Sequence, residues 1–244
     1  MNVSFIKWYV FSSFTVLALL FIYPQYIVKI HRKFNITEMP VDGHEYYKQF
    51  AWQSFSNRTL TLDKNSQQLL FIGDSRVNGL CVESLFSAMN IAISGETLLE
   101  AKDKVKGLHN LENKRIVIAL GVNDIGRKTE DIIADYKLVI SRFPASSTIY
   151  ISSILPLDET ASRKFHASKT NTQIKEVNRL MSAFAESADN IYYLDTTNGL
   201  CDLALNLKSD LHNGDGVHLN KEGNLIWAQS IKNVLASIEK HQII

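Results

Sequence analysis

The sequence has few cysteines and almost no net charge, so it lacks the features typical of cysteine metal sites, disulfide scaffolds and polyanion-binding proteins. Only Cys81 and Cys201 are cysteines, which excludes a metal site built from several cysteines and a disulfide-rich scaffold. One disulfide and two free thiols both remain open, so cysteine usage does not identify the cellular compartment. The formal net charge is only +1, so no overall positive field attracts nucleic acid. The 244 residues, 45% of them hydrophobic, are enough for one domain with a sizeable core, or for a domain with an appendage.

Charge is missing from one long stretch near the N-terminus, residues 8–28. About 20 consecutive apolar residues are enough to cross the hydrocarbon layer as a helix. Trp8 and Tyr9 stand at one end and Tyr23 and Tyr26 near the other, where amphipathic rings settle at a membrane interface. We therefore predict a transmembrane helix that anchors the chain through residues 8–28. A cleaved signal peptide, for which no small-residue cleavage site follows, and a buried core helix are the alternatives.

Residues 34–66 are mixed in composition and contain scattered aromatic residues without a clean period. We interpret them as a stalk that packs partly on the following domain. The predicted organisation is a membrane anchor over residues 1–33, a stalk or linker over 34–66 and one folded domain over 67–244.

Short apolar runs alternate with longer amphipathic stretches in the remainder of the chain. The runs are apolar at both odd and even positions, as in strands covered on both faces. They lie at residues 68–73, 89–93, 115–120, 148–154 and 191–195. Helical patterns occupy residues 129–143, 171–188 and 220–240. This alternation predicts a parallel five-stranded sheet with helices on both sides.

Three polar turns that contain glycine follow the first three predicted strands, at residues 73–75, 94–97 and 121–124. Ligands bind at the carboxyl ends of the strands in sheets of this kind, so we expect these turns to meet at one edge. Each turn taken alone is explained by ordinary turn or helix-cap chemistry. Their shared position indicates a functional site.

Ser75 is the candidate nucleophile at this edge. A serine nucleophile requires a base within hydrogen-bond reach, a group that orients the base, and donors for the oxyanion. Asp215 and His218 lie in the stretch DGVHLN, where one short loop can present both side chains. Asp215 would hold one ring nitrogen while the other takes the serine proton. His212 lies close enough in sequence to be an alternative to His218.

Three groups are candidate donors to the oxyanion. Gly95 can present its backbone N–H without a side chain in the way, and Asn123 can donate from its amide. The backbone N–H of Ser75, at the start of a predicted helix, is the third.

The order and spacing of these residues resemble the SGNH hydrolases, also called the GDSL esterase/lipase superfamily. The first family block resembles GDSR here, with Ser75 as nucleophile, and the second resembles NIAISGET, with Gly95 as an oxyanion donor. The third, G-x-N-D, resembles GVND, with Asn123 as another donor. The last, D-x-x-H, resembles DGVHLN, with Asp215 and His218.

The resemblance covers approximately residues 68–236. It implies a three-layer α/β/α domain of the flavodoxin-like kind, a Ser-His-Asp triad, and no metal or organic cofactor. The expected architecture is therefore one N-terminal transmembrane helix followed by this domain.

Arg76 departs from the family pattern, in which many members have leucine at this position. A cation beside the nucleophile can bind a carboxylate or phosphate on the substrate, so Arg76 is a candidate substrate-binding residue. A surface arginine with a local ion pair is the alternative.

The expected function is a membrane-anchored serine esterase that cleaves small acyl esters, such as O-acetyl groups on a glycan, through an acyl-serine intermediate. Lipid esters and thioesters are further candidate substrates. An O-acyltransferase that modifies a polysaccharide with a membrane partner is the main alternative, because a sugar hydroxyl can intercept the same acyl-serine. A non-catalytic binding or scaffold module is the third interpretation.

Positive residues lie on both sides of the predicted span, Lys7 before it and Lys29, Arg32 and Lys33 after it. The small excess after the span favours a cytoplasmic domain by the positive-inside rule. We nevertheless expect an extracytoplasmic catalytic domain. The family resemblance and the single anchor suggest an enzyme that acts on envelope or secreted material.

Overall fold

The structure, a computed structural model, describes residues 43–163 and 168–242. The chain divides into two compact units, Met1–Ala51 and Trp52–Ile244. The predicted anchor at residues 8–28 lies outside the described residues. Within the described ranges, no helix is both long enough and apolar enough to cross a membrane.

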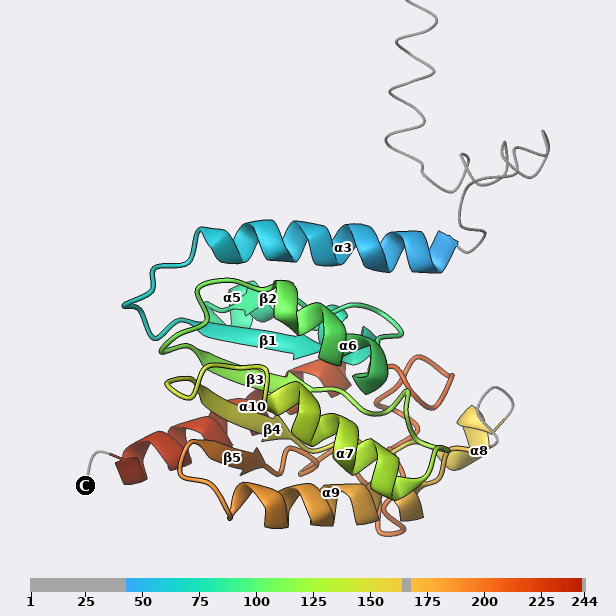
Figure 1. The fold of residues 1–244 in the computed structure, drawn as a ribbon. Helices are drawn as coiled ribbons and strands as arrows, with labels where there is room; N and C mark the ends of the chain where they lie inside the picture. Colours follow the sequence, from blue (N-terminus) through green and yellow to red (C-terminus); the bar gives the residue numbers. More distant parts are fainter. Residues whose placement is uncertain (1–42, 164–167, 243–244) are drawn as a thin grey trace, which may run out of the picture. The chain divides into compact units, whose positions relative to one another are not determined.

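The second unit is built on a five-stranded parallel sheet, as predicted (Figure 1). The strands are β1 (Leu69–Gly73), β2 (Met89–Asn90), β3 (Arg115–Ala119), β4 (Thr148–Ser152) and β5 (Ile191–Leu194). Their spatial order is β2-β1-β3-β4-β5, which is the flavodoxin-like order. The chain moves outward from β1 to β2 and then returns to β3 on the other side. The direction of winding therefore reverses between β1 and β3, the position where such sheets bind ligands.

Strand β2 is shorter than the predicted run at residues 89–93. Its ladder pairs Leu70 with Met89 and Phe71 with Asn90. The backbone N–H groups of Ile91 and Ile93 still donate to the carbonyls of Phe71 and Gly73, at 2.9 and 3.0 Å. The segment therefore follows β1 toward its carboxyl end even where it is no longer a regular strand.

Helices cover both faces of the sheet, which gives three layers (Figure 1). Helices α6 (Leu98–Lys104), α7 (Thr129–Ile140) and α9 (Asn171–Ala185) lie on one face. Helices α5 (Val82–Phe86) and α10 (Lys221–Gln242) lie on the other, where Trp227 and Ile231 of α10 join a buried cluster with Phe71 and Val117. Leu70 and Ile116, which alternate with those strand residues, are buried as well. Because the side chains at both odd and even strand positions are buried, the strand sequences are continuously apolar and do not alternate with polar residues.

Helix α3 (Gly43–Leu60) falls within the stretch that the sequence predicted to be a stalk. Its apolar residues do not gather on one face, so no helical period revealed it. The part within the second unit packs on the domain, because the Thr59 hydroxyl accepts from the backbone N–H of His109 at 2.9 Å. Arg58 donates to the carbonyl of Asn90 in the edge strand β2. The boundary at residue 67 stays a prediction, but residues 52–66 contribute buried contacts to the domain.

The turn from β1 into the short helix α4 (Ser75–Asn78) requires glycine at position 73. A Cβ atom at Gly73 would lie 2.3 Å from Cγ2 of Val77 and 3.0 Å from the carbonyl oxygen of Ala119. Asp74 then caps α4 by accepting from the backbone N–H of Arg76 at 2.9 Å. The strand therefore ends in a tight turn that places Ser75 at the first position of a helix.

We predict that Gly73→Ala destabilises the protein by about 1–3 kcal/mol, because the added methyl group has to displace Val77 or the backbone of β3. The measurement is the free energy of unfolding from urea denaturation. Gly107→Ala is the matched control, since a Cβ there would meet nothing within 4 Å. It should change stability by less than about 0.5 kcal/mol. Equal effects of the two substitutions would contradict this explanation of Gly73.

Candidate active site

The three polar turns meet at the carboxyl ends of β1, β2 and β3, as the sequence predicted. Asn78 of α4 donates from its amide to the Ser94 hydroxyl at 3.0 Å, which joins the first turn to the second. Asn123 donates from its amide to the carbonyl of Glu96 at 2.9 Å, which joins the third turn to the second. Gly95 and Gly121 have positive φ angles, 74° and 109°, a backbone conformation that favours glycine.

The structure brings Ser75, His218 and Asp215 into one hydrogen-bonded line. Nε2 of His218 lies 2.9 Å from Oγ of Ser75, across 143 positions of sequence. Nδ1 of the same ring lies 2.5 Å from Oδ2 of Asp215. The side chains of His218 and Asp215 are 44% and 34% exposed, so a substrate can reach them from solvent. One loop presents the side chains of both Asp215 and His218, as the sequence predicted.

Asp215 is held as an anion by its own loop. Partial burial alone would raise the pKa of Asp215, but hydrogen bonds outweigh it and lower the pKa to about 2. The donors are the His218 ring and the backbone N–H groups of Val217 and His218. A carboxylate that stays charged at neutral pH fixes which ring nitrogen carries the hydrogen and stabilises a protonated imidazole.

His212, the alternative base, has both ring nitrogens bonded to groups other than Ser75 and supports the same loop. Its Nδ1 accepts from the backbone N–H groups of Gly214 and Gly216, at 3.0 and 3.1 Å. Its Nε2 therefore carries the hydrogen and donates to Oδ2 of Asp158 at 3.2 Å. The two histidines of the region have different tasks, because one lies beside Ser75 and the other supports the turn around Asp215.

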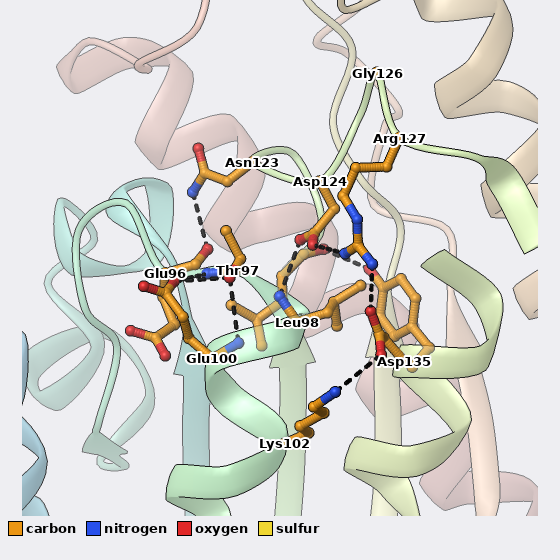
Figure 2. A network of polar contacts seen from close by, with 12 residues as sticks. Glu96, Thr97, Leu98, Glu100, Lys102, Asn123, Asp124, Gly126, Arg127 and Asp135 are labelled. Atoms are coloured by element: carbon orange, nitrogen blue, oxygen red, sulfur yellow. Dashed lines mark hydrogen bonds and ion pairs between the residues drawn. The ribbon is translucent and has the colours of Figure 1, made fainter. Parts of the chain in front are cut away.

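A buried polar network supports the turns that carry Gly95 and Asn123 (Figure 2). Asp124 is fully buried, and its Oδ2 accepts from the backbone N–H of Leu98 at 3.0 Å. Its Oδ1 accepts from Arg127 at 2.6 Å, and Arg127 also donates to Asp135 on α7 at 2.7 Å. Burial raises the pKa of Asp124, although its hydrogen bonds to Leu98 and Arg127 oppose that shift. The network ties the second turn, the third turn and α7 into one unit (Figure 2).

Sequence reasoning missed this network because Asn123-Asp124 looked like an ordinary turn pair. One signal was present in the helical pattern at residues 129–143. Asp135 is a buried acidic residue beside the apolar positions Ile132, Tyr136 and Val139. An acid in the apolar stripe of a helix indicates a buried partner of opposite charge, here Arg127.

The prediction that Arg76 binds substrate does not fit its geometry. The side chain is only 5% exposed, and its guanidinium donates to three main-chain carbonyls of the protein itself. The alternative of a surface ion pair does not fit either, because the group is buried. Its neighbour Asp74 is buried too, and burial raises the pKa of Asp74 to about 6 against the opposing effect of Arg76.

The site contains the elements of acyl transfer by an activated serine. A hydroxyl, an imidazole and a carboxylate lie in order, and the turns that carry Gly95 and the Asn123 amide end at the same edge of the sheet. Among the described residues, no group of three or more His, Cys, Asp or Glu side chains is placed to hold a metal ion. Cys81 and Cys201 are free thiols.

The fold is shared with solved structures from bacteria. A GDSL-like lipase from Bacteroides thetaiotaomicron is 20% identical, with 79% of this chain and 99% of that chain covered and a TM-score of 0.59. A protein from Streptococcus pneumonia assigned as a platelet activating factor is 21% identical, with 76% and 91% covered and a TM-score of 0.66. The C-terminal catalytic domain of Streptococcus pneumoniae peptidoglycan O-acetyltransferase A is 19% identical, with 72% and 96% covered and a TM-score of 0.53.

In sequence, no curated protein matches the chain. The family model described as the GDSL-like Lipase/Acylhydrolase family matches residues 71–226. This range is more than half of the chain, and it contains Ser75, Gly95, Asn123, Asp215 and His218. The sequence-based identification is confirmed, and the chain belongs to the GDSL-like lipase/acylhydrolase family.

Proposed function

We propose that the protein is a serine esterase that cleaves small acyl esters through an acyl-serine intermediate. The observation that carries the proposal is the position of the His218 ring, 2.9 Å from the Ser75 hydroxyl and 2.5 Å from the Asp215 carboxylate. Membership of an acylhydrolase family supports the same reaction class.

In the proposed reaction, Ser75 Oγ attacks the ester carbonyl carbon while His218 Nε2 takes the hydroxyl proton. Asp215 accepts from Nδ1 and stabilises the imidazolium that forms. The tetrahedral intermediate collapses, the alcohol leaves with the proton from His218, and Ser75 carries the acyl group. Water then attacks the acyl-serine in the same way and regenerates the hydroxyl. No step requires a metal or an organic cofactor.

The proposed oxyanion donors are the backbone N–H groups of Ser75 and Gly95 and the amide of Asn123. One hydrogen of the Asn123 amide is used in the 2.9 Å bond to the Glu96 carbonyl. That bond orients the side chain, and the second amide hydrogen is the one that would point to the oxyanion. Loss of one such donor typically costs about 10²–10³ in kcat.

We propose a small acyl group, such as an O-acetyl group on a glycan, as the substrate. The structurally similar domain from Streptococcus pneumoniae belongs to a peptidoglycan O-acetyltransferase, so this fold handles acetyl groups on a glycan in at least one protein. The substrate end of the site is accessible, because the His218 side chain is 44% exposed. Arg76 is not part of the proposed substrate contact.

We predict that Ser75→Ala lowers kcat for p-nitrophenyl acetate by about 10³-fold or more, because no other group takes over the nucleophilic attack. Asp215→Asn should lower it by on the order of 10⁴, since the ring loses the partner that fixes its tautomer. Release of p-nitrophenol by the full-length protein is the measurement.

Ser84→Ala is the matched control, because Ser84 is an exposed serine on α5 that donates only to the Cys81 carbonyl nearby. It should keep the native rate. A native rate in Ser75→Ala would reject Ser75 as the nucleophile and favour the non-catalytic scaffold.

The O-acyltransferase is the second candidate, and the fold likeness to a peptidoglycan O-acetyltransferase favours it. The two functions differ only in what attacks the acyl-serine. With an isotope-labelled acetyl donor and an added glycan oligosaccharide, an esterase should release labelled acetate, as mass spectrometry can detect. Labelled oligosaccharide in excess over free acetate would instead establish the transferase and overturn hydrolysis.

We also propose that residues 8–28 anchor the protein and that the catalytic domain is extracytoplasmic. Support comes from the uncharged stretch with aromatic residues at its ends. Alkaline phosphatase fused after Ile244 should be active, and green fluorescent protein fused there should be dark. The opposite pattern would place the domain in the cytoplasm.

A further inference from the structure

The peptide group that joins Val217 to His218 is held at both of its ends. Its N–H donates to Oδ1 of Asp215 at 2.9 Å. Its carbonyl oxygen accepts from Nε of Arg76 at 2.9 Å. The two partners come from different parts of the chain, since Asp215 belongs to the same loop and Arg76 lies 141 positions before Val217. The backbone of the candidate base therefore cannot tilt without breaking one of these bonds.

The rest of the Arg76 guanidinium holds a second loop. Nη1 donates to the carbonyl of Leu155 at 2.7 Å, and Nη2 donates to that of Pro156 at 3.0 Å. This loop, between β4 and α8 (Glu159–Ser162), also binds the histidine loop directly, because the N–H of Asp158 donates to the Gly216 carbonyl at 2.9 Å. Arg76 thus joins three segments, namely α4, the loop after β4 and the loop that carries His218.

We propose that Arg76 is a positioning residue that presets the contact between Ser75 and His218, an inference that rests on the proposed function. Ser75 and Arg76 are consecutive residues of α4, so the nucleophile and the group that holds the His218 peptide move together. Ser75 is then connected to His218 through the peptide bond to Arg76, the hydrogen bond from Arg76 to the Val217 carbonyl and the peptide bond from Val217 to His218. This chain of contacts sets the distance between the Ser75 hydroxyl and the His218 ring. A misplacement of about 1 Å in such an arrangement can cost about 10² in rate.

The position requires arginine because each of the three carbonyls accepts from a different nitrogen of one planar guanidinium group. A lysine ammonium is a single point on a flexible stem and cannot reproduce this fork. Burial lowers the pKa of Arg76 to about 10, while the charges of Asp74 and Asp215 oppose that shift. The guanidinium therefore remains charged at neutral pH and donates strongly to the carbonyls.

Lys114 is a matched comparison that separates positioning from general stabilisation. It is also fully buried, and its Nζ donates to three main-chain carbonyls, those of Asp63, Ser66 and Glu112, at 2.7, 2.8 and 3.1 Å. It directly precedes β3, at the end of the sheet opposite the candidate site. Removal of either cation leaves three main-chain carbonyls without their donor, but of the two only Arg76 bonds to the loop of His218.

The experiment compares Arg76→Lys, Arg76→Met and Lys114→Met in the full-length protein, with p-nitrophenyl acetate as the substrate. Both methionine variants should have a lower urea midpoint than the native protein. Arg76→Lys and Arg76→Met should lower kcat by about 10²-fold with little change in KM. Lys114→Met should keep the native kcat. Arg76→Lys retains the charge, so it remains informative where Arg76→Met fails to fold.

Hydrogen–deuterium exchange provides a readout that does not depend on activity. Exchange in residues 213–220 should rise in both Arg76 variants, because the amides of Val217 and His218 lose the support that keeps them bonded to Asp215. Lys114→Met should not change exchange there.

The proposal is overturned if the Arg76 variants keep the native kcat, or if they lose it without faster exchange in residues 213–220. It is also overturned if Lys114→Met lowers kcat equally. If the native protein itself hydrolyses no ester while exchange rises as expected, the loop contact stands and the proposed function fails.

Discussion

The parallel pairing of β1 with β3 is the constraint on which the candidate site depends. Five consecutive residue pairs, from Leu69 with Arg115 to Gly73 with Ala119, keep the two strands in register. Both strands therefore end at the same level, and the chain leaves them in adjacent turns. One turn carries Ser75 and the other carries Asn123. Because β2 lies on the far side of β1, the turn that carries Gly95 joins the same edge. The reversal of winding between β1 and β3 thus generates the site before any polar contact is considered.

Polar contacts to the backbone then hold the turns in place. Asp124 accepts from the N–H of Leu98, Arg76 donates to the carbonyl of Val217, and His212 accepts from two glycine N–H groups. Loops have few apolar side chains to pack, so buried charged and polar groups that bind main-chain atoms define their conformation. Each such group is satisfied by several partners, which offsets the cost of its burial. Lys114 holds loops in the same way at the other end of the sheet.

The pKa values of two carboxyl groups close to Ser75 in the chain or in the site, Asp74 and Asp215, are shifted in opposite directions. Asp74 is buried at the N-terminus of α4, and burial raises its pKa to about 6. Asp215 is partly exposed and accepts three hydrogen bonds, so its pKa falls to about 2 despite partial burial. Such separation is common where two acids have different tasks. Here Asp74 caps the helix that begins at Ser75, and Asp215 provides the negative charge that faces the His218 imidazole.

The sequence by itself determined the parallel sheet, its strand positions, the family and the candidate residues Ser75, Gly95, Asn123, Asp215 and His218. These follow from local signals, since apolar runs define strands and short polar motifs follow them directly. Only the tertiary structure decided that His218 faces Ser75 while His212 supports the loop, and that α3 forms within the predicted stalk. It also decided that Arg76 is buried against Val217, Leu155 and Pro156. The physical reason is that the deciding partner lies far away in sequence: the Ser75 hydroxyl is 143 positions from His218, and the partners of Arg76 are backbone carbonyls of two distant loops. Every residue has a backbone carbonyl and almost every residue a backbone N–H, so the pattern of side chains in the sequence does not predict which backbone group a buried charged side chain will bind.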